Sequence, residues 1–177
     1  KKVLIHLSSC AVYGSYFHLK NHIIDEKTSP DPISTYAKTK LKGERIIIEN
    51  KNNKLSYVII RPSQVVGKNM NALGFIHLAK FIKRRIFVYV STLNAVRNYV
   101  NSEDLINLIY RILKLKKIKN KIYVISRYSK LKSIIKFIKK RLNLSNQINL
   151  VLPKLPLIIV VSFVRLFFKD FPVNKEI

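Results

Sequence analysis

Two side chains that are four residues apart, Tyr36 and Lys40, could together perform acid–base chemistry. On a helix, residues at this spacing project from the same face, one turn apart. A phenol in isolation titrates at about pH 10, and a neighbouring ammonium group favours its ionised form. Such a pair could exchange a proton with a substrate hydroxyl near neutral pH. The hydroxyl of Ser9, brought close by folding, could hold the same substrate oxygen.

The elements that must position these side chains alternate along the sequence. Apolar, β-branched runs predict strands over residues 2–7, 55–60, 86–90, 97–100, 121–125 and 148–152. Amphipathic patterns predict helices over residues 34–50, 71–83, 102–115, 129–142 and 155–168. Ser34 and Ser102 are the expected N-caps of two of them, and residues 14–33 read as a surface loop. This alternation indicates an α/β protein with a mainly parallel sheet.

The composition is strongly basic, with 34 Lys and Arg against 9 Asp and Glu, a formal net charge of +25. Such an excess would attract phosphates, nucleic acid or an anionic membrane surface. The lysines alternate with Ile and Asn, as is typical of solvated faces, and the sequence contains no named nucleic-acid-binding motif. We therefore expect no nucleic-acid partner and, from the charge, only weak contact with a membrane surface.

Other features bound the class of protein further. The single cysteine, Cys10, excludes an internal disulfide and fits a reducing, cytoplasmic location. The longest apolar run, residues 157–168, contains Arg165 and is shorter than the roughly 20 residues that span a bilayer. The 4 histidines show no metal-ligand spacing, so no metal is expected. With only 4 glycines, the sequence carries no Gly-rich phosphate-binding loop.

Four ordered segments carry a resemblance to a known family. They read SSCAVYG at residues 8–14, YAKTK at 36–40, RPSQVVG at 61–67 and RNYVNSEDL at 97–105. In order and separation they resemble the extended short-chain dehydrogenase/reductase family, the NAD-dependent epimerase/dehydratase group that acts on nucleotide sugars. The resemblance covers residues 1 to about 125.

The resemblance also implies an architecture. Residues of about 1–67 and 97–125 would form the C-terminal part of a Rossmann-like parallel sheet. Residues of about 68–96 and 126–177 would form a small α/β substrate-binding region. The family binds NAD through a Gly-x-x-Gly-x-x-Gly turn after its first strand, and this sequence lacks that turn. We therefore expect a fragment truncated at its N-terminus, without the dinucleotide-binding half.

Residue by residue, the resemblance implies a catalytic triad of Ser9, Tyr36 and Lys40. Ser9 would hold the substrate oxygen, and Tyr36 would be the acid and base on the sugar hydroxyl. Lys40 would tune Tyr36, and both would contact the nicotinamide ribose. The alternatives are structural: a hydroxyl that caps a turn for Ser9, and a solvated helix face for the other two.

Four more positions match binding residues of the family. Pro62 and Ser63 would line the nicotinamide, and Gln64 would lie near the substrate. Arg97 matches an arginine that contacts the nucleotide diphosphate, which suits a bidentate guanidinium group. The alternatives are a simple turn for the first three residues and a surface arginine for the last.

The resemblance predicts NAD(P)-dependent epimerisation or reduction at a ring hydroxyl of a nucleotide sugar, by hydride transfer, with NAD or NADP as cofactor. Cys10 and Ala11 stand where dehydrating members carry an Asp-Glu pair, which argues against a 4,6-dehydratase. The implied partners are the nucleotide-sugar substrate and a second copy in a homodimer. The alternative hypothesis is an inactive remnant or a non-catalytic, NAD(P)-sensing member of the family. A third hypothesis is a steroid- or flavonoid-type reductase of the same superfamily.

Overall fold

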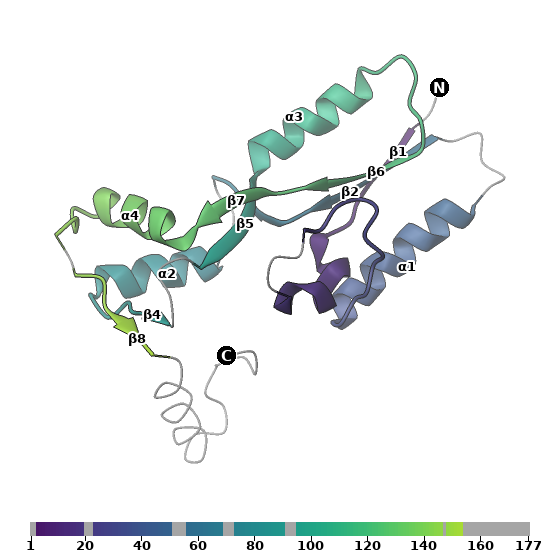
Figure 1. The fold of residues 1–177 in the computed structure, drawn as a ribbon. Coiled ribbons are helices and arrows are strands. Elements are labelled where there is room, and N and C mark those ends of the chain that lie inside the picture. Colours follow the sequence, from purple (N-terminus) through teal and green to yellow (C-terminus); the bar gives the residue numbers. More distant parts are fainter. Residues whose placement is uncertain are drawn as a thin grey trace. The chain divides into compact units, whose positions relative to one another are not determined.

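The computed structural model describes residues 3–19, 23–50, 56–68, 73–90, 95–146 and 148–153. Within these ranges, helices alternate with strands, and the paired strands whose register is defined run parallel (Figure 1). This confirms the predicted α/β class. The helix expected over residues 155–168 lies outside the described residues.

A parallel sheet in the order β1-β2-β6 forms the centre of the first part of the chain. Its strands are β1 (Val3–Leu7), β2 (Ser56–Pro62) and β6 (Lys121–Ile125). In the register, Ile5 lies opposite Val58 and Ile60 lies opposite Tyr123. The central strand is buried from Val58 onward, as is usual for a parallel strand covered on both faces.

Two helices cover opposite faces of this sheet (Figure 1). They are α1 (Thr35–Glu49) and α3 (Ser102–Leu113). Leu41 of α1 belongs to a cluster that includes Val124, whereas the cluster of α3 includes the adjacent strand residue Tyr123. Because neighbouring residues of a strand point to opposite faces, the two helices pack on different sides.

Eight further elements are described. They are the 3₁₀ helix η1 (Cys10–His18), β3 (Gln64–Val66), α2 (Leu73–Lys83), β4 (Tyr89–Val90), β5 (Val96–Asn101), β7 (Arg127–Lys130), α4 (Leu131–Arg141) and β8 (Val151–Leu152). Strands β3, β5 and β7 form a second sheet in the order β3-β5-β7, and β4 pairs with β8. Among the described helices, none combines the length and apolar character needed to cross a membrane.

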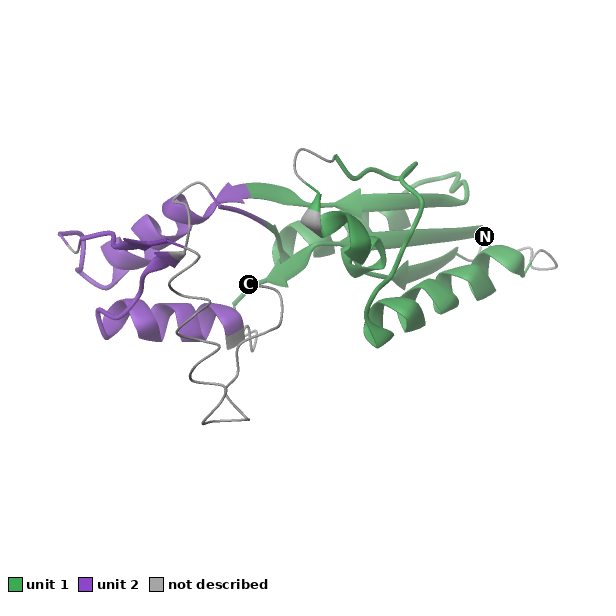
Figure 2. Ribbon diagram, turned by 60° about the horizontal axis from the view of Figure 1, so that its bottom comes forward, with its two compact units in different colours: residues 1–70, 98–128 green, residues 71–97, 129–177 purple. Residues whose placement is uncertain are grey.

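The chain divides into two compact units, coloured separately in Figure 2. The first contains residues 1–70 and 98–128, and the second contains residues 71–97 and 129–177. The core of the second unit is formed by Ile82, Tyr89 and Ile135. Each unit therefore has buried apolar residues of its own.

The structure corrects several expected boundaries. The hydroxyl of Ser34 accepts a hydrogen bond from the amide of Ala37, which confirms this N-cap of α1. The cap of α3 is Asn101, whose Oδ1 accepts from the amide of Glu103 at 3.1 Å, so the prediction of Ser102 was wrong. Ser102 already has helical geometry, because the extended strand ends one residue earlier.

Other corrections concern length. The predicted loop over residues 14–33 begins as a 3₁₀ helix, and β7 precedes α4 where only a helix was expected. The strands predicted over residues 86–90 and 148–152 shrink to the two-residue pair β4 and β8. Short apolar runs do not by themselves fix how many residues find a pairing partner.

Substituting Ile60→Ala should lower the free energy of unfolding by about 2–5 kcal/mol, because it opens a cavity in a fully buried position of the central strand. Urea denaturation of the whole chain measures this. The matched control is Ile23→Ala, in an exposed loop, for which we expect a change within about 0.5 kcal/mol. Equal losses for the two variants would contradict the described core.

Candidate active site

Lys40 links helix α1 to the carboxyl end of strand β1. Its Nζ donates a hydrogen bond to the backbone oxygen of Leu7, the last residue of the strand, at 3.0 Å. One turn earlier on the helix lies Tyr36, whose ring centroid is 5.8 Å from Nζ. An ammonium group has three donors, so this single bond leaves Lys40 able to hold a ligand as well.

Tyr36 lies in the first turn of α1, and 57 % of its surface is exposed. The cap at Ser34 fixes the start of this helix and with it the direction in which Tyr36 projects. The sequence prediction that Tyr36 and Lys40 share one helical face therefore agrees with the geometry. An exposed phenol beside an ammonium group is accessible to a substrate hydroxyl.

Ser9 lies two residues after the end of β1 and is the N-cap of the 3₁₀ helix η1. Its Oγ accepts a hydrogen bond from the amide of Ala11 at 3.1 Å. This is the capping role that we gave above as the structural alternative to a catalytic role for Ser9. A hydroxyl that accepts at a cap still has its own proton to donate, so capping and substrate contact are compatible.

The nicotinamide-lining candidates lie where the central strand ends. Pro62 is the buried last residue of β2, and the amide of Ser63 donates to the carbonyl of Ile125 at 2.8 Å. Among the described residues, the side-chain oxygens of Ser63 and Ser8 are buried without a hydrogen-bond partner. Both serines directly follow parallel strands, at the edge where open α/β sheets bind ligands.

The two substrate-binding candidates are exposed. Gln64 opens strand β3, and Arg97 lies on β5, where its Nη1 donates to the carbonyl of the preceding Val96 at 3.0 Å. The structure thus gathers Ser9, Lys40 and the neighbouring phenol around the end of β1. It leaves Arg97 as an exposed cation in the second unit.

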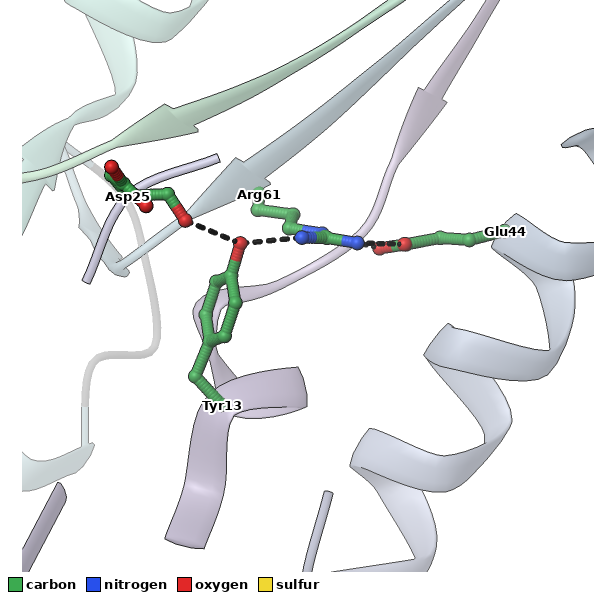
Figure 3. A network of polar contacts seen from close by, with 4 residues as sticks. All are labelled: Tyr13, Asp25, Glu44 and Arg61. Atoms are coloured by element: carbon green, nitrogen blue, oxygen red, sulfur yellow. Dashed lines mark hydrogen bonds and ion pairs between the residues drawn. The ribbon is translucent and has the colours of Figure 1, made fainter. Parts of the chain in front are cut away.

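Sequence reasoning missed a buried ion pair next to these residues. The guanidinium group of Arg61, on β2, donates two hydrogen bonds to the carboxylate of Glu44, on α1, through Nε to Oε1 at 3.0 Å and through Nη2 to Oε2 (Figure 3). Both side chains are almost fully buried. A bidentate pair of this kind fixes the helix against the strand in distance and in rotation.

Tyr13 extends this pair into a network. Its hydroxyl accepts a hydrogen bond from Nη1 of Arg61 and donates to the backbone oxygen of Asp25 at 3.1 Å (Figure 3). Burial raises the pKa of Tyr13, and the adjacent guanidinium group opposes this only in part. Burial would lower the pKa of Arg61, but the hydrogen bonds and charges of Glu44 and Tyr13 together outweigh burial and raise that pKa. Arg61 therefore stays charged and Tyr13 stays neutral.

A signal for this network was present in the sequence. Glu44 comes four residues after Lys40, so it continues the helical face that carries the candidate acid–base pair. Arg61 is a charge inside an otherwise apolar strand. A buried charge requires a partner, so an acid on the covering helix could have been anticipated.

Two more titratable groups adjoin this region. The thiol of Cys10 donates to the carbonyl of Arg61 at 3.1 Å, and burial raises its pKa to about 11 against the opposing effect of Arg61. The pKa of His6 is lowered, mainly by burial and to a smaller extent by the charge of Lys40, and the charge of Glu44 opposes this shift. Within the described ranges, no three His, Cys, Asp or Glu side chains gather as a metal site would require.

Substituting Glu44→Gln should lower the free energy of unfolding by about 3–5 kcal/mol, because it leaves the charge of Arg61 buried without its counter-ion. Chemical denaturation measures the loss. The matched control is Glu49→Gln, an exposed carboxylate of the same helix, which should change stability by less than about 0.5 kcal/mol. Similar effects at the two positions would contradict a buried pair.

The thiol of Cys10 should react slowly with a disulfide reagent in the folded chain and rapidly in urea. Only the thiolate is the nucleophile, and the pKa of the thiol is raised to about 11 in the folded chain. The unfolded thiol loses its proton near the usual 9.0, so stability should fall between about pH 9 and 11. A Cys10→Ala variant should lack that part of the decline. Equal reaction rates of the folded and unfolded chains would contradict this account.

Comparison with known proteins agrees with this geometry. The sequence pattern of the NAD dependent epimerase/dehydratase family matches residues 1–126. A curated relative, GDP-6-deoxy-D-talose 4-dehydrogenase from Aggregatibacter actinomycetemcomitans, is 25% identical over 108 residues, which cover 60% of this chain and 35% of the relative.

Solved structures show the same fold. The UDP-glucuronic acid 4-epimerase from Bacillus cereus, in complex with NAD, is 25% identical with a TM-score of 0.69, over 86% of this chain and 50% of that one. RMD from Pseudomonas aeruginosa, complexed with NADPH, is 15% identical with a TM-score of 0.64, over 86% of this chain and 54% of that one.

The match to these proteins is partial in length. The chain spans about half of the solved structures and about a third of the curated relative. The match to the family covers well over half of this chain and includes Ser9, Tyr36 and Lys40. The chain therefore belongs to the NAD-dependent epimerase/dehydratase family.

Proposed function

We propose that this chain supplies the acid–base part of an active site that oxidises a ring hydroxyl of a nucleotide sugar, or reduces the corresponding ketone, with NAD or NADP. The observation that carries the proposal is the bond from Lys40 to the end of β1, with Tyr36 beside it on the same helical face. This brings a phenol and an ammonium group to the strand end that Ser9 follows.

In this proposal, Tyr36 takes the proton from the substrate hydroxyl as the carbinol carbon is oxidised, and returns it on reduction. Ser9 donates a hydrogen bond to the same oxygen while its own oxygen still accepts from Ala11. Lys40, held by the carbonyl of Leu7, places its side-chain nitrogen beside the phenol. A nicotinamide, when bound, supplies the hydride acceptor.

The strand ends offer polar groups that fit a bound dinucleotide. The buried hydroxyls of Ser8 and Ser63, without partners among the described residues, lie just beyond β1 and β2. A ligand placed there could satisfy both, and burying an unpaired hydroxyl is otherwise costly. Similar structures hold NAD or NADPH, which supports the same cofactor class here.

The dinucleotide phosphates need a Gly-rich turn at a helix N-terminus, and the four glycines of this sequence form none. We propose that residues outside these 177 provide it. We further propose that the first unit carries the Rossmann-like sheet, and that the second binds substrate through Arg97. Gln64, which opens β3, would contact the sugar in this arrangement.

The reaction class follows from the neighbouring side chains. The raised pKa of Cys10 keeps its thiol protonated near neutral pH, and Ala11 carries no acid, so neither residue suits the dehydration of a sugar. The names of two similar proteins specify a 4-epimerase and a 4-dehydrogenase. We therefore propose epimerisation at the carbon that carries the 4-hydroxyl, or reduction of a 4-ketone to that hydroxyl.

The substitution Tyr36→Phe, made in this chain when joined to a dinucleotide-binding half, should lower kcat by about 10²–10⁴-fold, because it removes the proton-transferring group. Turnover of UDP- and dTDP-sugars with NAD or NADP measures this. The matched control is Tyr128→Phe, an equally exposed tyrosine on β7, which should retain full activity. Full activity of Tyr36→Phe would overturn the assignment, and cofactor binding without turnover in the unsubstituted protein would favour the non-catalytic alternative.

A further inference from the structure

The second unit has a one-sided charge. Its described residues include eleven Lys and Arg and no Asp or Glu, whereas those of the first unit include fourteen Lys and Arg and seven Asp and Glu. A general enrichment in lysine would raise the basic count of both units, but it would not remove every acid from one of them. Of the eleven cations, all except Lys139 are exposed, so the surface of this unit attracts anions.

Helix α4 gathers part of this charge on one half of its circumference. At about 100° per residue, its exposed side chains all fall within one half-turn of the helix axis. The opposite half contains Ile135 and Ile138, which pack with Ile82 in the core of the unit. The exposed face consists of Lys132, Ser133, Lys136, Phe137, Lys140 and Arg141.

Helix stability does not explain where these cations lie. Positive charge is favourable near a helix C-terminus, which accounts for Lys140 and Arg141, but it is unfavourable near the N-terminus. The start of α4 is basic nonetheless. The side chain of the N-cap Lys130 makes no capping hydrogen bond, Lys132 follows it closely, and the first turn contains no acid. This arrangement favours an anionic partner outside the unit as the reason for the charge.

An aromatic side chain lies among these cations. Phe137 is 60 % exposed, and the guanidinium carbon of Arg141 lies 5.3 Å from the centroid of its ring. Together with Lys140 and Asn143, these two residues line a hollow in the surface. An exposed apolar ring surrounded by cations complements an anionic bilayer, which presents charged headgroups with an apolar boundary beneath them.

We propose that the exposed face of α4 docks on an anionic membrane surface, with Phe137 entering the boundary between headgroups and acyl chains. Each Lys or Arg close to such a surface strengthens binding about fivefold. The proposal gives a place in the fold to the weak membrane contact expected from the composition. It does not depend on the proposed catalytic function.

The residues that follow α4 favour a membrane over a nucleic acid as the partner. Ile148 and Leu150 are 79 % and 59 % exposed. Aliphatic side chains can enter a bilayer, but they offer no ring on which a base stacks. Further along the sequence, residues 157–168 are apolar apart from Ser162 and Arg165. Stable attachment to a membrane surface needs an apolar contribution besides a basic patch, and the sequence of this unit supplies both.

The test measures binding of the whole chain to vesicles of phosphatidylcholine with and without about 30% phosphatidylserine. The chain should sediment with the anionic vesicles only, and added salt should release it. The double substitution Lys136→Gln, Lys140→Gln should weaken this binding at least about tenfold, because it removes two cations from the docking face. The matched control Lys116→Gln, Lys119→Gln removes two exposed cations of the first unit and should weaken it less than about twofold.

A second measurement reports on Phe137. The chain contains no tryptophan, so the substitution Phe137→Trp introduces a single fluorescent reporter on the docking face. Its emission should shift to the blue on anionic vesicles, because the ring enters an apolar environment. The matched control Tyr128→Trp, at an exposed aromatic position of the first unit, should show no shift.

Three results would overturn the proposal. They are an absence of binding to anionic vesicles, an equal loss of affinity for the two lysine pairs, and an unshifted emission of the Phe137→Trp variant. Tighter binding to an oligonucleotide than to the anionic vesicles would also overturn it, since that would identify a nucleic acid as the partner.

Discussion

The bidentate pair between Arg61 and Glu44 is the interaction on which the rest of the candidate site depends. It joins the central strand to the helix that carries Tyr36 and Lys40, and it does so in the interior, where water does not weaken it. Buried ion pairs add little net stability compared with apolar residues of the same volume. Their geometry is specific, however, and here it fixes the rotation of α1 about its axis.

The same pair ties further segments to the strand end. Tyr13 brings η1 and the loop at Asp25 to the guanidinium group, and Cys10 bonds to the carbonyl of the arginine itself. Three segments, α1, η1 and the loop at Asp25, are thus linked to strand β2 through Arg61 and Tyr13. Tyr36 and Lys40, which we propose to contact a substrate, lie on the helix that this buried network holds in place.

The sequence was sufficient for the parts of the fold that depend on local patterns. The spacing of Tyr36 and Lys40, the cap at Ser34 and the apolar run of β2 each predicted what the structure contains. The α/β class followed from their alternation. These features are determined within a few neighbouring residues, so no knowledge of the tertiary fold was needed.

What could not be predicted depends on contacts across the sequence. Glu44 and Arg61 are 17 residues apart, and their pairing requires knowledge of which helix covers which strand. The cap at Asn101 depends on where strand β5 ends, and the pairing of β5 with β3 sets that end. The length of β4 was likewise set by its partner β8 rather than by its own residues.

The carboxylate of Glu26 on the amide of Val124 has a consequence for assembly. A sheet can grow into a fibre only when each added chain presents a new free edge for the next one. Here the chain's own loop occupies an outward-facing amide of β6, so that edge is a poorer acceptor for an added strand than the outer edge of β1. Growth of the sheet from the β6 side is thereby opposed.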